Sequence, residues 1–183
     1  MSSTALLLVD IQNDYFESGR WPVENMEEVA ANAASLLAHG RETGIMIVHI
    51  RHESPSAQAP FFRPGSRGAQ IHPCVAPRDG ESVILKHRPN SFHDTRLKAL
   101  LDEHAITDLV ICGAMSQMCI DSTTRAAVDL GYKVMLVEDA CGAKEQLFRD
   151  QVIPAAQVHG AFMAPLAMSF ARLVSTETVL KGS

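Results

Sequence analysis

The sequence predicts an α/β fold in which a mostly parallel sheet of about six strands is covered by helices on both faces. Short runs of consecutive apolar residues alternate with segments whose apolar residues recur at helical spacing. Apolar runs without alternation are typical of strands that are buried on both faces. Most links between these segments are short, which favours parallel strands joined by crossover helices.

Each element has its own signal. The expected strands cover residues 5–9, 45–48, 82–85, 107–112, 133–137 and, as a short final strand, 172–174. The expected helices cover residues 24–41, a segment with Leu97, Leu100 and Leu101 that Asp94 caps, and residues 117–130 and 146–162. Gly44 and Gly131 mark two helix ends, and Pro154 interrupts the last helix or marks its restart.

Length and composition favour a single globular domain spanning residues 1–183, with 46% hydrophobic and 20% charged residues. The net charge of −5 provides no basic surface for nucleic acid. The first apolar run is too short to span a bilayer and no basic leader precedes it, so we expect no membrane partner and a cytoplasmic location. The four cysteines show no C-x-x-C spacing, which suits free thiols in a reducing compartment.

Cys119 follows an apolar strand and a turn of small residues, and it begins the next expected helix. The N-terminus of a helix offers unpaired N–H groups and partial positive charge, which favour a thiolate nucleophile and could stabilise an oxyanion. A small buried apolar side chain at a packed helix start explains the same residue, so both interpretations stay open on this segment alone.

Two other reactive side chains follow strands. Asp10 comes directly after the first strand and Lys86 after the third. The carboxyl ends of parallel strands meet at one edge of a sheet, where such folds bind their ligands. We therefore expect Asp10, Lys86 and Cys119 to lie together, although Asp10 could cap a strand end and Lys86 could be a surface lysine beside His87 and Arg88.

Residues 52–80 break the regular alternation, with five prolines and no periodicity. Loops longer than roughly 12–15 residues in a compact domain are usually functional or disordered. The adjacent aromatics Phe61 and Phe62 favour a packed segment, so we predict a lid over the substrate or an oligomer contact rather than a disordered insertion.

The segments 10–16 (DIQNDYF), 83–86 (VILK) and 113–119 (GAMSQMC) together resemble the isochorismatase-like cysteine hydrolases, over about residues 5–162. The resemblance implies a Rossmann-like three-layer sandwich, an Asp10–Lys86–Cys119 triad and a cofactor-independent hydrolase of C–N bonds in a small amide, acting through a thioester. It also implies a cis peptide bond between Ala114 and Met115, with the N–H groups of Met115 and Cys119 as the oxyanion hole. Family members are commonly oligomers, which implies a homodimer or homotetramer.

The residues expected to contact substrate are Gln12, Tyr15, Phe16, Phe62, Phe92 and Gln117, although aromatic residues are as often part of the core. The metal-binding Asp-x-His of nicotinamidase relatives is missing, so we expect no bound metal, even though His49, His52 and His72 could meet in space. True isochorismatases lack the nucleophilic cysteine, so Cys119 disfavours that activity. A ligand-binding relative without turnover and a redox-sensing thiol paired with Cys74 are the alternatives.

Overall fold

The structure, a computed structural model, describes residues 3–182 and confirms the predicted α/β fold. Within this range six parallel strands form one sheet in the order β3-β2-β1-β4-β5-β8. These strands are β1 (Thr4–Val9), β2 (Met46–His52), β3 (Ser82–Lys86), β4 (Asp108–Ala114), β5 (Lys133–Gly142) and β8 (Arg172–Val174). The α-helices of the described range are α1 (Met26–Thr43), α2 (Leu97–Glu103), α3 (Asp121–Asp129), α4 (Ala155–Ser169) and α5 (Thr176–Leu180).

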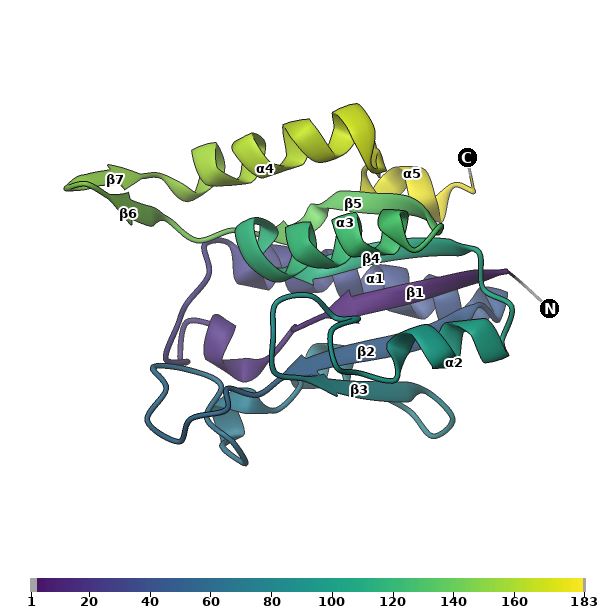
Figure 1. Cartoon of the computed structure of the whole chain (residues 1–183), viewed down its shortest axis with the longest axis horizontal. Helices are drawn as coiled ribbons and strands as arrows, with labels where there is room; N and C mark the ends of the chain where they lie inside the picture. The colour runs from purple at the N-terminus through teal and green to yellow at the C-terminus, as the bar shows by residue number, and fades with distance from the viewer. Residues whose placement is uncertain (1–2, 183) are drawn as a thin grey trace.

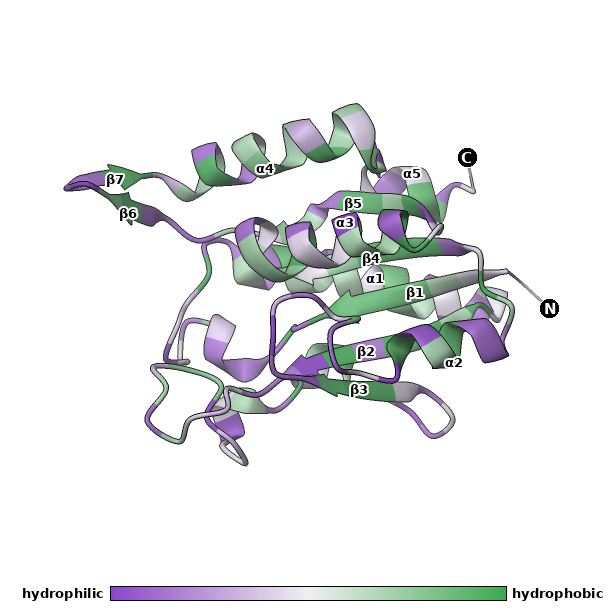
Figure 2. Ribbon diagram, viewed as in Figure 1, coloured by the Kyte–Doolittle hydropathy of each residue, from purple (hydrophilic) through white to green (hydrophobic). Residues whose placement is uncertain are grey.

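The sheet lies between two helical layers (Figure 1). Side chains alternate between the faces of a strand, so Leu6 and Leu8 of β1 pack with α1, whereas Leu7 and Val9 pack with α2 and α3. All four of these side chains are at most 2% exposed. The apolar character of β1 at every position therefore follows from burial on both faces, and Figure 2 shows the same apolar colouring along β1 and β4.

The helix predicted over residues 146–162 is wrong before Pro154, but the predicted restart at Pro154 is confirmed. Residues 146–153 form an antiparallel hairpin of β6 (Gln146–Phe148) and β7 (Gln151–Ile153), and α4 starts only after Pro154. Arg149 and Asp150 at the tip have φ angles of 48° and 61°, which match the right-handed twist of a hairpin. Neither residue is the Asn or Gly that usually signals such a turn.

Two helix starts also differ from the prediction. The residue that precedes α2 is Arg96, and Asp94 lies in the turn before it with a φ of 52°, so Asp94 is not the cap. The helix expected over 117–130 consists of a π-helical turn at Ser116–Ile120 followed by α3. Cys119 therefore lies in a wide turn that joins β4 to α3 rather than in the first turn of a regular helix.

The long segment after β2 is packed against the end of β1. It contains two 3₁₀ turns, Arg67–Ala69 and Pro73–Val75. The side chain of Asp14 accepts a hydrogen bond from the N–H of Phe62 at 2.7 Å, and Phe62 is 1% exposed. The rings of Tyr15 and Phe62 lie 4.6 Å apart, so this segment is packed as predicted, with Phe62 buried and Phe61 partly buried.

The strand order indicates where on the sheet a ligand site is expected. The chain runs outward from β1 to β2 and β3 on one side, and β4, β5 and β8 continue on the other side. The connections thus reverse direction between β1 and β4, and a crevice at the carboxyl ends of such strands is the usual ligand site of open α/β sheets. Asp10 ends β1 and Cys119 follows β4, so these two residues flank that point.

Gly113 of β4 permits the close approach of β1 there. Its φ is 130°, and a Cβ atom added to it would lie 1.9 Å from the carbonyl oxygen of Val9. The pairing of β4 with β5 also shifts register between Ile111 and Gly113. Only glycine satisfies both the backbone conformation and this separation.

We predict that Gly113→Ala lowers the free energy of unfolding by at least about 2 kcal/mol, because backbone strain and overpacking add. The matched control is Gly80→Ala, where φ is 88° but no atom lies within 4 Å. The control loses about 1 kcal/mol from the backbone conformation alone. Urea unfolding of both variants checks this, and equal losses would contradict the steric argument.

Candidate active site

Four strand ends bring their side chains to one point. Asp10 follows β1 with a φ of 54°, His52 ends β2, Lys86 ends β3, and Cys119 lies in the turn after β4. The structure therefore brings together the three residues that the sequence singled out, Asp10, Lys86 and Cys119. The side chain of Lys86 passes the end of β2 to reach Asp10 on the strand beyond.

The ammonium group of Lys86 is the centre of this cluster. Its Nζ lies 2.7 Å from Oδ2 of Asp10 and 3.2 Å from Sγ of Cys119. It also lies 3.2 Å from Nδ1 of His52 and 3.1 Å from the carbonyl oxygen of Arg88. An ammonium has three protons to donate, and four acceptor atoms lie around it, so every N–H of Lys86 has a partner. The arrangement fixes the position of the positive charge relative to the thiol.

The charges of this cluster are removed from solvent. Asp10 and Lys86 are 0% exposed and Cys119 is 3% exposed. Burial is the largest single effect and lowers the pKa of Lys86, but the interactions with Asp10 and Cys119 together outweigh it, and the pKa of Lys86 is raised overall. Lys86 therefore stays protonated as one member of a buried ion pair.

Burial raises the pKa of the Cys119 thiol, and the charge of Asp10 raises it further. Lys86 acts in the opposite direction but does not compensate. The expectation that the helix start favours a thiolate was therefore wrong. Its physical reason is that the buried ion pair next to the thiol has no net charge to offset the cost of burying a second anion.

A neutral thiol beside Asp10 needs a base only at the moment of reaction. The Sγ of Cys119 and a carboxylate oxygen of Asp10 lie within 4.8 Å of each other. Among the described residues, none donates a hydrogen bond to Oδ1 of Asp10. This oxygen is thus a free acceptor for the proton that leaves Cys119.

His52 is a member of the cluster that the sequence did not assign. Its Nδ1 lies 4.0 Å from Sγ of Cys119 and 3.9 Å from Oδ2 of Asp10. Burial lowers the pKa of His52 to about 4, so the ring is neutral at pH 7. Because Nδ1 faces the Lys86 ammonium, the ring proton belongs on Nε2. His52 ends β2, so the same strand-end argument that found Asp10 and Lys86 could have found it.

Gln12 holds the backbone at His52. Its Nε2 donates to the carbonyl oxygens of His52 and Ala69, and its Oε1 accepts from the N–H of His52 at 2.7 Å. The amide of Gln12 is therefore fully used within the protein. Its predicted contact with substrate stays a prediction, while its positioning of His52 is visible in the structure.

The turn that carries Cys119 begins at the predicted cis peptide bond between Ala114 and Met115, which the structure confirms. The carbonyl oxygen of Met115 accepts from the N–H groups of Met118 and Ile120. Gln117 donates from Nε2 to the carbonyl oxygen of Lys144 at 3.1 Å. Its Oε1 is buried and has no hydrogen-bond partner among the described residues, which leaves it available to a ligand.

The predicted aromatic residues divide into two groups. Tyr15 lies near the cluster: burial raises its pKa, and the negative charge of nearby Asp10 raises it further. The rings of Phe62 and His52 have centroids 5.8 Å apart. Phe16 instead stacks on His72 at 3.7 Å, and Phe92 stacks on Tyr132 at 5.9 Å. Neither stacking partner is a triad residue, so the binding roles of Phe16 and Phe92 stay predictions.

Asp10, His52 and Cys119 carry donor atoms within 4.8 Å of one another, the kind of set that can hold a metal ion. Lys86 Nζ lies within 3.2 Å of all three residues, so a cation already occupies the space between these donors. The set therefore does not fit a metal unless Lys86 moves away. The other candidate ligands do not join it, because His49 pairs with Glu81 and His72 contacts Cys74.

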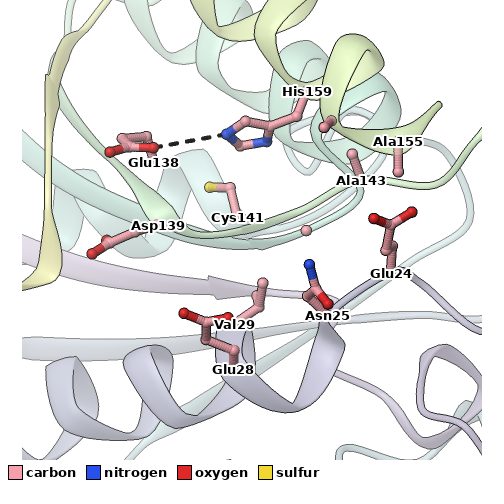
Figure 3. Close-up of a pocket in the computed structure, with 12 residues that line it drawn as sticks. Glu24, Asn25, Glu28, Val29, Glu138, Asp139, Cys141, Ala143, Ala155 and His159 are labelled. Carbon is pink, nitrogen blue, oxygen red and sulfur yellow. Dashed lines mark ion pairs between the residues drawn. The ribbon is translucent and has the colours of Figure 1, made fainter.

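A cavity of about 290 Å³ lies elsewhere, between α1, the end of β5 and the start of α4 (Figure 3). Acidic side chains line it, among them Glu24, Glu28 and Glu138, together with His159. No triad residue lines it. The cavity and the triad at the strand ends are therefore separate features.

Comparison with known proteins agrees with this geometry. The isochorismatase domain model matches residues 4–177. The chain belongs to the isochorismatase family. It is 47% identical over 98% of its length to the uncharacterized isochorismatase family protein YddQ of Bacillus subtilis, 99% of which is covered. A crystal structure of an isochorismatase-type hydrolase from Oleispira antarctica superposes with a TM-score of 0.94 at 50% identity, covering 98% of this chain and 96% of the other.

A more distant member of the isochorismatase family has a named activity. The streptothricin hydrolase of Streptomyces noursei is 38% identical over 136 residues, which is 74% of this chain but only 48% of that protein. The family and the amidase-like activities of some members support a hydrolase. Among residues 3–182, no helix is long and apolar enough to cross a membrane.

The two charged neighbours of Cys119 should change its reactivity in opposite directions. Asp10→Asn removes the negative charge that raises the thiol pKa, so alkylation of Cys119 by iodoacetamide at pH 7.5 should become faster. Lys86→Met removes the positive charge and should make alkylation slower. Peptide mass spectrometry measures the rate at Cys119, with exposed Cys74 as the internal control. Changes in the same direction in both variants would contradict the assigned electrostatics.

Proposed function

We propose that this protein hydrolyses a C–N bond in a small amide through a thioester on Cys119. The observation that carries the proposal is the Sγ of Cys119 held 3.2 Å from Nζ of Lys86, which itself lies 2.7 Å from the Asp10 carboxylate, at the carboxyl edge of the sheet. A nucleophile with an adjacent base is the usual arrangement for covalent catalysis.

The first step forms a bond between Sγ of Cys119 and the carbonyl carbon of the substrate. Asp10 takes the thiol proton as this bond forms, and Lys86 keeps its position against both groups. The carbonyl oxygen gains negative charge, and the N–H groups of Met115 and Cys119 are the donors proposed for it. The C–N bond then breaks, and Asp10 returns its proton to the leaving nitrogen.

The second step hydrolyses the thioester. Asp10 removes a proton from water, the oxygen attacks the acyl carbon, and the carbon–sulfur bond breaks. The products are a carboxylic acid and an amine or ammonia, and Cys119 regains its proton. His52 is neutral in this scheme and keeps Lys86 in place by accepting one of its hydrogen bonds.

The burial of Cys119 limits the size of the substrate group that can reach its thiol. Cys119 is 3% exposed, so only a slender group can reach its sulfur. Tyr15 and Phe62 lie next to the cluster, and the free Oε1 of Gln117 could accept a hydrogen bond from an amide N–H of the substrate. We infer a small-molecule substrate and propose a panel of amides, ureido compounds and lactams to find it.

Cys119→Ala should lower kcat by at least about 10³-fold on any substrate from that panel, because loss of a nucleophile removes the covalent route. The matched control is Cys112→Ala, since Cys112 is also fully buried but lies in the middle of β4. Substantial turnover by purified Cys119→Ala would contradict covalent catalysis. Absence of turnover in the wild type on the entire panel would favour a ligand-binding member instead.

Activity should survive prolonged dialysis against EDTA, because Lys86 fills the space between the donor atoms. The check is the rate before and after dialysis, with the metal content of the protein measured in parallel. Loss of activity that zinc or manganese restores would show that Lys86 moves aside for a metal ion.

A further inference from the structure

One polar side chain of α4 lies toward the protein interior rather than toward water. In α4, all of which lies within residues 3–182, His159 is the only polar side chain that is not exposed. The buried residues of this helix are otherwise apolar, and its sequence includes no Asp, Glu, Lys or Arg. A polar group in an apolar layer needs a hydrogen-bond partner there. The partner of His159 therefore indicates what this residue does.

That partner is Ser116, in the turn that carries Cys119. Oγ of Ser116 lies 2.9 Å from Nδ1 of His159 and 3.1 Å from the carbonyl oxygen of Gly142. Ser116 is 0% exposed, so its hydroxyl is shielded from solvent and depends on these two partners. Gly142 is the last residue of β5 and pairs with Ala114 at the end of β4. The hydroxyl thus links the start of the turn to β5 and to α4.

The two contacts of Ser116 determine which ring nitrogen of His159 carries a proton. A carbonyl oxygen only accepts, so the single hydroxyl proton of Ser116 goes to Gly142. The hydroxyl oxygen then accepts, and Nδ1 of His159 is the donor. Burial lowers the pKa of His159, so the ring is neutral at pH 7 and Nε2 carries no proton. Nε2 lies 3.9 Å from Glu138 at the wall of the cavity shown in Figure 3.

We propose that Ser116 and His159 are positioning residues for the oxyanion hole. Ser116 directly follows Met115, and the proposed function assigns the N–H groups of Met115 and Cys119 to the oxyanion. The inference rests on that function, because an oxyanion forms only when a carbonyl group is attacked. Neither Ser116 nor His159 belongs to the triad. They act by holding the backbone of residues 115–119.

The orientation of this turn matters because a donor stabilises an oxyanion only when it points to where the charge develops. Loss of one such donor typically lowers the rate roughly 10²–10³-fold, so a small rotation of the turn is measurable. The hydroxyl of Ser116 opposes such a rotation, because its partners lie on two different elements, β5 and α4. Gln117 adds a contact to the carbonyl oxygen of Lys144. The turn is therefore held at two consecutive side chains.

Two reactions of Cys119 separate the oxyanion hole from the thiol itself. With p-nitrophenyl acetate, Sγ attacks the acetyl carbon, an oxyanion forms, p-nitrophenolate leaves and a thioester results. With iodoacetamide, Sγ displaces iodide from a saturated carbon and no oxyanion forms. The thiol proton goes to Asp10 in both reactions. Both rates are measured on the full chain at pH 7.5, and the rates in Cys119→Ala are subtracted as background.

Ser116→Ala should slow acylation about 10-fold or more, because the oxyanion donors lose their anchor, while alkylation stays within about twofold of the wild type. His159→Gln should do the same, because its longer side chain places the amide beyond the position of Nδ1. His159→Asn should restore most of the acylation rate, because its amide nitrogen can donate from near that position. The matched control is Thr124→Val, which removes a fully buried hydroxyl that has no hydrogen-bond partner among residues 3–182. This control should leave both rates unchanged.

Nitrogen-15 NMR of the histidine rings adds a measurement that needs no reaction, and it should show His159 of the wild type protonated on Nδ1. Circular dichroism checks that each variant is folded. Wild-type acylation in folded Ser116→Ala would overturn the inference and leave the proposed function intact. Equal slowing of acylation and alkylation, or a proton on Nε2 of His159 in the wild type, would also overturn it. A wild type whose Cys119 is alkylated but never acylated would instead contradict the proposed function, and the inference with it.

Discussion

The ion pair between Asp10 and Lys86 is the interaction on which the site depends. Both side chains are removed from water, and their charged atoms are 2.7 Å apart. Breaking a buried pair by removing one partner typically costs about 3–5 kcal/mol, because an uncompensated charge remains. The pair is therefore a strong constraint on how β1 and β3 are placed, even though β2 lies between them.

Neighbouring side chains and backbone groups hold Lys86 and Cys119 in position around Asp10. His52 and the carbonyl oxygen of Arg88 accept from the same ammonium, and Gln12 holds the backbone of His52 in place. Cys119 approaches from β4 on the other side of Asp10, where Gly113 allows the two backbones to come close. The thiol thus meets a fixed base and a fixed cation. Its reactivity depends on their geometry rather than on a standing negative charge.

The sequence was informative where one physical rule decides the outcome. Apolar runs predicted the strands, and the parallel arrangement of those strands predicted that Asp10, Lys86 and Cys119 would converge. The sequence-based prediction failed where local sequence preferences and long-range packing favour different structures. Residues 146–153 carry apolar residues that suit a helix as well as a hairpin, and the turn at Arg149 and Asp150 has no glycine to reveal it. The state of the Cys119 thiol was missed because it depends on burial and on the balance of two opposite charges, which only the three-dimensional structure provides.

The central claim is that Cys119 is a neutral thiol beside a buried ion pair, so that Asp10 serves as the base during catalysis. The most direct measurement is the thiolate absorbance near 240 nm from pH 5 to pH 8, taken as the difference between the wild type and Cys119→Ser. The account predicts no thiolate signal from Cys119 across this range, because burial and Asp10 raise its pKa. A difference signal that rises below pH 7 would show a standing thiolate and would contradict the account.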